Sequence, residues 1–328
     1  MRMSEDKELI SDLDRAGRPK SLDHQYDDGF TVSRPYRESL PDVQNRTGVE
    51  IHGDGVPIIE VGISNFHLPL KVLTAQNESI DLEAAVTGTV SLGSDRKGVN
   101  MSRIIRTFYE FKDRVFTLEL LEEILLRYKE TLESSRARLT VRFSYPIYQE
   151  SLRSGLGGYL YYDVDYEGII DDLDRFRKRM HLDFIYSSVC PNSAELAEHA
   201  RNMRGKYALP HAQRSKARVS VEVRSGALVT IENIREKCLE ALRTEVQSMV
   251  KREDEQAFAE LNGSFPKFVE DAVRLLHEKF NVDKRIIDFQ IACVHLESLH
   301  AHDAVAVINK GVSGGFSGSV EDFRRFVC

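Results

Sequence analysis

Cys190, at the start of an expected helix, is the residue of this 328-residue chain whose type and position most clearly allow chemistry. Cys190 ends an apolar, strand-like run and precedes a helix that Asn192 or Ser193 is expected to cap, with Glu195 completing a capping box with Asn192. The positive end of the helix dipole lowers the pKa of a thiol at this position and favours the thiolate. A thiolate can bind a metal ion or act as a nucleophile, whereas the structural alternative is a buried, inert cysteine.

Other residues of the second half of the chain could act together with this cysteine. They are His211, which opens the segment HAQRS; Glu255, in a charged connection at 250–256; Glu270, on a helix that begins at Pro266; and His300, between the last two strands. Taken singly, each also fits a structural interpretation, because acidic runs are usually solvated faces and loop histidines are usually exposed. Glu270 falls outside the apolar stripe of its helix and should face solvent in a monomer. Together the side chains form a mixed thiolate, imidazole and carboxylate set that suits zinc or a neighbouring first-row ion.

The elements that must position these residues occur in the same order twice. In the first half we expect strands at 56–68 and 80–92, helices at 101–112 (capped by Asn100 or Ser102) and 117–134, and strands at 137–148 and 158–170. In the second half we expect strands at 175–189 and 217–224, helices at 230–249 and 266–280, and strands at 285–296 and 304–308. Strands that flank paired helices predict an α+β fold, with an antiparallel sheet and helices on one face.

This element order divides the chain into four parts. Residues 1–45 are charged and turn-rich and are expected to form a partly disordered arm, with a short acidic helix possible at 8–15. Residues 46–172 and 173–310 are the two β-β-α-α-β-β modules, the second of which carries most candidate site residues. Residues 311–328 are a Gly/Ser-rich tail that we expect to be flexible. Because open sheet edges are usually covered or paired, we expect the sheets to join edge to edge into an oligomeric barrel.

Composition limits the classes of function. The net charge of −7 predicts no broad nucleic-acid surface. Four scattered cysteines make no disulfide framework. Apolar runs are too short to span a bilayer, and the N-terminal sequence is not a signal peptide, so we expect neither a nucleic-acid nor a membrane partner and a cytoplasmic location.

Eight short segments of the chain form an ordered set: LPDVQ at 40–44, VGI at 61–63 with LP at 68–69, KGVNMSR at 97–103, SVCP at 188–191, HAQRS at 211–215, VKR at 250–252 with DE at 254–255, FVED at 268–271 and ESLH at 297–300. In this order they resemble GTP cyclohydrolase of the type I-B class, a metal-dependent family of bacteria and archaea. The resemblance implies a tunnelling fold (T-fold) of two modules per chain. It also implies a homo-oligomer, for which we expect a tetramer, with active sites at subunit interfaces.

The resemblance also implies a reaction. The imidazole ring of GTP is opened, C8 leaves as formate, and the product recloses as 7,8-dihydroneopterin triphosphate, the first step of a folate or pterin pathway. A divalent metal ion (zinc, or manganese or iron) would be held by Cys190, Glu255 and His300, with His211 in or beside the ligand shell. The ion lowers the pKa of a bound water, and His211 is the implied proton shuttle.

The substrate contacts are implied in the same way. Glu270 would accept from the guanine N1–H and 2-amino group, two parallel donors that match one carboxylate. The candidates for the triphosphate are Arg103, Arg214, Lys251 and Arg252, and the sequence does not choose among them. One departure concerns the segment after Cys190, because the family often has Cys-Pro-Cys where this chain has Asn192 as the third residue. If the second cysteine of that pattern were the metal ligand, Asn192 would weaken or abolish metal binding.

Two other functions remain open from the sequence. One is a relative on the same fold that acts on another purine or pterin, or that stops at the ring-opened formamide. The other is a catalytically silent oligomeric protein that keeps the purine pocket and binds no metal. All five chemistry-bearing groups are present in the chain, which favours the cyclohydrolase.

Overall fold

The computed structural model describes residues 24–42, 44, 51–320 and 323. The chain divides into two compact units, one of residues 1–56 with 94–99 and one of residues 57–93 with 100–328. In the described part of the first unit, the short helix α2 (Arg34–Ser39) begins after Ser33, whose hydroxyl accepts a hydrogen bond from the Tyr36 amide at 3.3 Å. The predicted helix at 8–15 lies outside the described residues.

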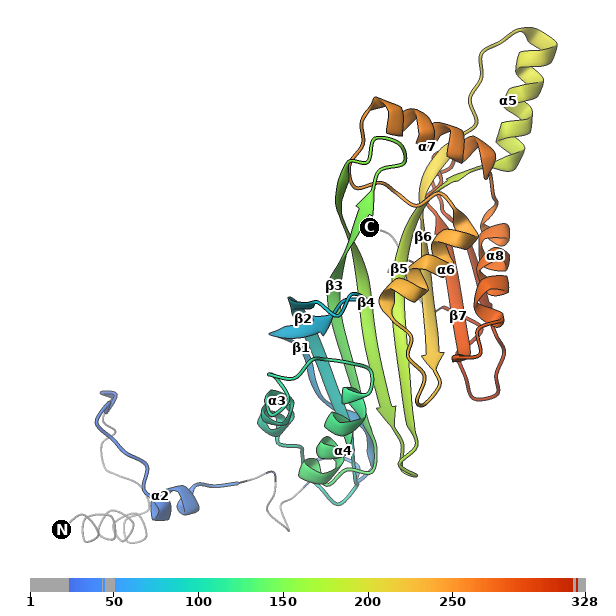
Figure 1. Ribbon diagram of the computed structural model, residues 1–328. Coiled ribbons are helices and arrows are strands. Elements are labelled where there is room, and N and C mark those ends of the chain that lie inside the picture. The colour runs from blue at the N-terminus through green and yellow to red at the C-terminus, as the bar shows by residue number, and fades with distance from the viewer. Residues whose placement is uncertain (1–23, 43, 45–50, 321–322, 324–328) are drawn as a thin grey trace. The chain divides into compact units, whose positions relative to one another are not determined.

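The second unit is built on one antiparallel sheet of eight strands, in the order in which they occur along the chain (Figure 1). The strands are β1 (Ile58–Leu73), β2 (Ser79–Leu92), β3 (Ala137–Glu150), β4 (Gly157–Ile170), β5 (Phe176–Val189), β6 (Ala212–Val223), β7 (Ile286–His295) and β8 (Ala304–Asn309). The sheets of the two modules join where β4 pairs with β5, from Val164 opposite Leu182 to Ile170 opposite Phe176. Edge-to-edge joining of the two modules, as predicted, therefore occurs within one chain.

The helices of the first module are α3 (Met101–Tyr109) and α4 (Leu120–Leu132). Helix α4 packs on β3 and β4 through a fully buried stripe that includes Leu121, Leu125 and Tyr128. These residues are spaced by three or four positions, which places them on one face of the helix. The order β-β-α-α-β-β predicted for this half is confirmed.

The second module keeps this order and adds two helices. Helices α6 (Ile231–Leu242) and α8 (Val269–Asn281) lie on β5 and β7 (Figure 1). The additional helices are α5 (Pro191–Arg204), between β5 and β6, and α7 (Arg252–Ser264), between α6 and α8. The α+β class with an antiparallel sheet is confirmed, whereas closure into an oligomeric barrel and the four-part division of the chain stay predictions.

Two predicted boundaries in the second module are wrong. The helix expected over 230–249 ends at Leu242, because Arg243 adopts a left-handed backbone with φ of 67° and Glu245 then pairs with Tyr186 of β5. Strand β6 begins at Ala212, five residues before the expected start at 217. Four of the five added residues, Gln213 to Lys216, are polar, so the segment lacks the apolar pattern by which a buried strand is usually found.

Residues of the tail contact the sheet. The Phe316 ring lies 4.4 Å from the Arg179 guanidinium, and the Phe316 amide donates to Asp288 at 2.6 Å. Arg177 donates to the Gly314 carbonyl at 3.1 Å. The segment 314–316 thus makes specific contacts with β5 and β7, although its glycine and serine content predicts flexibility.

A buried carboxylate connects the two modules. Glu245, which is 2% exposed, accepts hydrogen bonds from Arg235 of α6 at 2.9 Å, from Tyr162 of β4 at 2.6 Å and from Gln149 of β3 at 3.0 Å. A buried carboxylate needs such partners because its desolvation is costly. Glu245 therefore holds α6 of the second module to two strands of the first.

Replacing this carboxylate should destabilise the fold. We expect Glu245→Ala to lower the free energy of unfolding by about 3–5 kcal/mol, because it leaves Arg235 partly buried without its partner. The matched control is Glu130→Ala, which removes the exposed pair with Arg127 and should cost about 0–1 kcal/mol. Denaturant unfolding measures both, and equal losses for the two variants would contradict the role given to Glu245.

Candidate functional site

The core face of the sheet becomes polar at one end of β5, β6 and β7. Side chains at every second position of a strand share a face. On β5 the buried residues run from Phe184 through Tyr186 to Ser188, and on β7 they run from Cys293 to His295. On β6 the same face carries Gln213 and Ser215 before the apolar positions that follow, and the register pairs Ser188 with Gln213 and Ser215 with His295. The three strands thus bring their polar ends together.

Cys190 and His211 lie one step beyond these polar residues. The Cys190 amide donates to the His211 carbonyl at 3.3 Å, which extends the pairing of β5 with β6. The His211 amide donates to the Ser193 hydroxyl at 3.2 Å. The structure therefore places the two residues predicted to be catalytic next to each other, just beyond the ends of adjacent strands β5 and β6.

His211 also has two acceptors beside its Nδ1 atom. Gln213 Oε1 lies 3.1 Å from Nδ1, and Glu297 Oε2 lies 3.6 Å from it. The side chains of His211 and Glu297 are 17% and 13% exposed. Glu297 Oε2 is buried and accepts no hydrogen bond from the described residues, which leaves an acceptor oxygen open beside the histidine.

The cap predicted for the helix after Cys190 is wrong. Helix α5 begins at Pro191, and Cys190 itself is the N-cap residue, without a side-chain capping hydrogen bond. Proline favours the first helical position because its fixed φ suits the helix and it has no N–H to satisfy. Neither Asn192 nor Ser193 caps the helix, and the Ser193 hydroxyl bonds His211 instead. The thiol is consequently closer to the helix terminus than expected.

Glu255 lies on a helix, whereas the sequence analysis expects a charged connection. Helix α7 begins after Lys251, and the neighbouring Asp254 carboxylate accepts backbone N–H bonds from Lys251, Arg153 and Ser154, each at 2.8 Å. Burial alone would raise the pKa of Asp254, but the Ser154 hydroxyl and these backbone N–H groups outweigh it and hold the pKa well below its usual range. Asp254 thus attaches the first turn of α7, and with it Glu255, to the loop between β3 and β4.

Three predicted site residues are exposed on the surface of the second unit. Glu255 and Glu270 are exposed on α7 and α8, and the prediction that Glu270 faces solvent in a monomer is confirmed. His300 is exposed in the loop between β7 and β8, where its ring stacks on His302 with centroids 4.8 Å apart. All three are accessible to a neighbouring subunit.

The four cationic candidates for the triphosphate lie on different elements. Arg214 on β6, and Lys251 and Arg252 at the start of α7, are exposed. Arg103 on α3 donates to the Thr131 carbonyl of α4 at 3.3 Å, a structural contact within the first module. Among the described residues, no hydrogen bond or ion pair within one chain links any of these four side chains to Cys190.

Cys190, Glu255 and His300 do not form a ligand set within one chain. Among the described residues, no three His, Cys, Asp or Glu side chains are placed to hold a metal ion. What the structure does bring together is the His211 imidazole and the open carboxylate oxygen of Glu297, with the backbone of Cys190 paired to that of His211. Thiol, imidazole and carboxylate are the ligand types that suit a divalent first-row ion.

Four buried polar residues of the site were missed by the sequence analysis. Glu297 stands in the segment ESLH, of which only the histidine was considered, and Gln213 stands in HAQRS. Ser188 and His295 lie on β5 and β7 with apolar neighbours. In the sequence, each can be recognised only as a polar residue near the end of a strand, at a position that would face the core.

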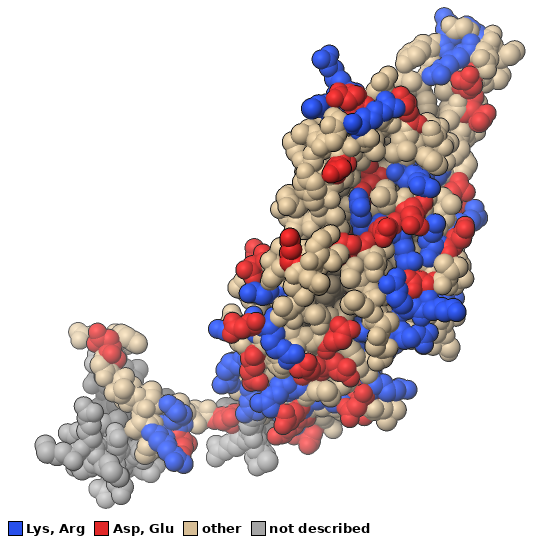
Figure 2. All heavy atoms as spheres, viewed as in Figure 1, with Lys and Arg blue, Asp and Glu red and all other residues tan. Residues whose placement is uncertain are grey.

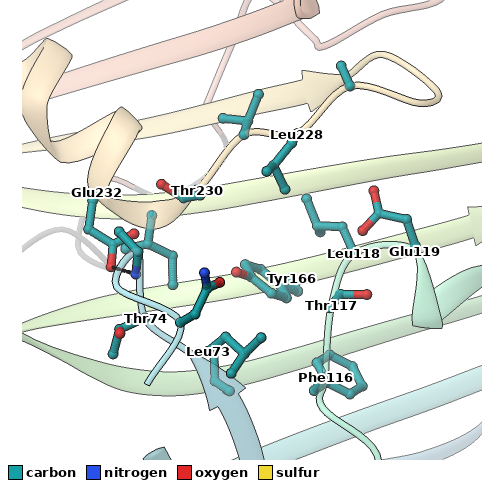
Figure 3. A pocket seen from close by; sticks show the side chains of 16 residues that line it. Leu73, Thr74, Phe116, Thr117, Leu118, Glu119, Tyr166, Leu228, Thr230 and Glu232 are labelled. Carbon is teal, nitrogen blue, oxygen red and sulfur yellow. Dashed lines mark hydrogen bonds between the residues drawn. The ribbon is translucent and has the colours of Figure 1, made fainter. Parts of the chain in front are cut away.

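A separate cavity of about 200 Å³ lies between the end of β1 and the starts of α4 and α6, around Tyr166 (Figure 3). Glu232 at its edge accepts hydrogen bonds from the Ala75 amide at 3.1 Å and from the Tyr145 hydroxyl at 2.6 Å. None of the predicted site residues lines this cavity. Its volume is below the roughly 300–1,000 Å³ typical of ligand sites.

On the face of the second unit shown in Figure 2, basic and acidic side chains are interspersed. Several form exposed pairs, such as Arg114 with Glu123 and Lys279 with Glu240.

Over the described residues, the structure contains no helix of the length and apolar character needed to cross a membrane.

Comparison with known proteins decides the family. The model of the type I GTP cyclohydrolase FolE2 family matches residues 40–306. The chain belongs to this family. The GTP cyclohydrolase FolE2 of Dinoroseobacter shibae is 52% identical over 293 residues, which are 89% of this chain and 80% of the relative. That of Roseobacter denitrificans is 49% identical over 304 residues, 92% of this chain and 82% of the relative. The predicted family resemblance is confirmed.

Among solved structures, a uricase from Arthrobacter globiformis aligns with 80% of this chain and 95% of its own, at a TM-score of 0.47 and 10% identity. The FolE2 assignment depends on the sequence relationships alone.

Burial of His295 should make the stability of the protein depend on pH. Burial, together with the charge of Lys267, lowers the pKa of His295 to about 4. In the unfolded chain a histidine takes up its proton near pH 6.5, so only the unfolded state gains a proton between about pH 6.5 and 4. We therefore expect the free energy of unfolding to fall as the pH is lowered through this window.

Denaturant unfolding at several pH values tests this expectation. His295→Gln, which cannot be protonated, should flatten the decline between about pH 6.5 and 4. His199→Gln, on the exposed face of α5, is the matched control and should leave the decline unchanged. An undiminished slope in His295→Gln would refute the assignment to His295.

Proposed function

We propose that this protein is a GTP cyclohydrolase that converts GTP and water to 7,8-dihydroneopterin triphosphate and formate, a hydrolase acting on cyclic amidine C–N bonds. The observation that carries the proposal is the FolE2 match over residues 40–306, with relatives about 50% identical over most of the chain. The adjacent Cys190 and His211 supply the thiol and imidazole that such a reaction uses. The product would enter a folate or pterin pathway.

A divalent ion is the proposed cofactor, with zinc, manganese or iron as candidates. Cys190, Glu255 and His300 would hold it, and His211 would stand in or beside the ligand shell. When bound, the ion supplies Lewis acidity that makes hydroxide available near neutral pH. The fit of thiol, imidazole and carboxylate groups to first-row ions supports this assignment.

His211 is the proposed proton shuttle. Imidazole changes its protonation near neutral pH, and a general acid or base must lie within hydrogen-bond reach of the group that it serves. The His211 side chain is 17% exposed, so it is mostly buried but still accessible from solvent. Its Nδ1 atom lies beside acceptor groups of the protein. The opposite edge of the ring, at Nε2, is the one that would exchange a proton with the purine.

Glu270 is the proposed guanine anchor, and Arg103, Arg214, Lys251 and Arg252 remain the candidates for the triphosphate. An exposed carboxylate at the first turn of α8 is accessible to a substrate bound between subunits. Its two oxygens match the parallel N1–H and 2-amino donors of guanine. Arg214 and Lys251 follow and precede site residues closely in sequence, which supports their candidacy over that of Arg103.

The oligomer is part of the proposal. We propose a homotetramer in which T-fold sheets join into a barrel and the active sites lie between subunits, in the cytoplasm. Strands β1 and β8 are the outer strands of the sheet, and outer strands carry backbone groups that can pair with another chain. The exposure of Glu255, Glu270 and His300 supports an interface site, because a partner would complete their surroundings.

GTP turnover tests the function directly. Protein loaded with zinc, manganese or iron should release formate from GTP and give a fluorescent neopterin after oxidation. Cys190→Ala should lower kcat/KM by on the order of 100-fold or more, since loss of even an outer partner of a ligand costs 10–100-fold. Cys238→Ala, a buried cysteine of α6, is the control and should keep the activity of the folded fraction. No turnover with any of the three metals would exclude the function, and full activity of Cys190→Ala would exclude the site.

Glu270→Gln should weaken guanine recognition. An amide in place of the carboxylate turns one acceptor into a donor, and a hydrogen bond to a charged group is worth about 1.5–3 kcal/mol, or roughly 10- to 100-fold in kcat/KM. Glu278→Gln, exposed two turns later on the same helix, should have no effect. Steady-state kinetics with GTP separates the two variants, and identical parameters would disprove the role of Glu270.

A further inference from the structure

Beneath His211 lies a connected group of buried polar side chains. Gln213, Ser188, Ser215 and His295 are 8%, 0%, 0% and 2% exposed. Gln213 Nε2 donates to Ser188 Oγ at 2.8 Å, and Ser188 Oγ lies 2.8 Å from Ser215 Oγ and 3.2 Å from His295 Nδ1. Hydrogen bonds inside a protein are strong and their partners hold one another in place. The group is therefore a rigid base under the histidine.

The Gln213 amide lies between Ser188 and His211, and a serine hydroxyl can pair with either end of it. The amide nitrogen is a donor and the amide oxygen only accepts. With Nε2 on Ser188, Oε1 is directed at His211 Nδ1, 3.1 Å away. The reversed amide would place an NH2 group against Nδ1 and would need a lone pair there, whereas the carboxylate of Glu297 beside the same nitrogen favours a hydrogen on Nδ1.

An acceptor beside Nδ1 selects one form of the neutral imidazole. Nδ1 must carry the hydrogen to bond Gln213 Oε1, so the lone pair is on Nε2. The carboxylate of Glu297, whose Oε2 lies 3.6 Å from the same nitrogen, favours the same form. The nitrogen that points away from this base is thereby kept free to accept a proton or to bind a metal ion.

We infer that Gln213 is a positioning residue, which holds His211 in the Nδ1–H tautomer while Ser188 binds the nitrogen end of its amide. This inference rests on the proposed function for its kinetic consequence, because His211 is the proposed proton shuttle. Gln213 acts through His211. Ser215 and His295 contact the Ser188 hydroxyl and complete the buried group.

Kinetics and the tautomer of His211 together test the inference in the full-length protein. Gln213→Leu keeps the size of the side chain but removes the acceptor. It should lower kcat/KM for GTP by about 10- to 100-fold, as for other partners that orient a functional histidine. Nitrogen-15 spectra of histidine-labelled protein, with the His211 signal assigned by comparison with His211→Gln, should show Nδ1–H in the wild type and a mixture or Nε2–H in Gln213→Leu.

Two further variants separate positioning from a structural role. Gln213→Glu keeps an acceptor beside Nδ1, so it should retain the Nδ1–H signal and exceed Gln213→Leu in kcat/KM. Ser188→Ala releases the amide and should shift the tautomer in the same direction as Gln213→Leu, which provides a second test if Gln213→Leu does not fold. Gln290→Leu, a glutamine of β7 whose amide donates to the Ser317 carbonyl, is the matched control and should change neither measurement.

An unchanged Nδ1–H signal in both Gln213→Leu and Ser188→Ala would overturn the inference, even if activity fell, because the loss would then be structural. Failure of the proposed function has a different signature, since the wild-type protein would then not turn over GTP with any metal. The His211 spectra can be recorded in that case too and decide the tautomer independently.

Discussion

The alternation of side chains along β5, β6 and β7 is the constraint on which the site depends. The face that buries Phe184 and Cys293 is the same face that carries Ser188, Gln213 and His295, and Cys190 and His211 lie directly beyond the strand ends. A slip of one residue in this register would move each of these side chains to the opposite face of the sheet. Packing of the apolar core against α6 and α8 therefore also sets the position of the reactive groups.

Much of the sheet could be predicted because its strands are long and regularly patterned. Strands β2, β5 and β7 lie within a residue or two of their expected ranges. The elements that were missed owe their structure to contacts distant in sequence. Helix α7 buries only Asp254 and Ala257 and so lacks an apolar stripe, and its first turn is stabilised by backbone groups of another loop. The end of α6 at Leu242 depends on the buried pairing of Glu245, which no local pattern reveals.

The candidate site was predictable to a similar extent. Cys190 and His211 could be selected by residue type and family segments, and the structure places them side by side. Gln213 and Ser188 could not, since a polar residue near a strand end is common and its role depends on which residue the register sets opposite it. Glu255 and His300 are exposed on separate elements, so the convergence that we propose for them would require other subunits, whose arrangement one sequence does not determine.

The attachment of α7 makes the second module depend on a loop of the first. Asp254 binds the backbone of Arg153 and Ser154, in the loop between the last two strands of the first module. The helix that carries Glu255 in the second module is thus fastened by a loop of the first. A change in the β3–β4 loop would therefore reach the proposed metal ligand Glu255 without altering any residue of the second module.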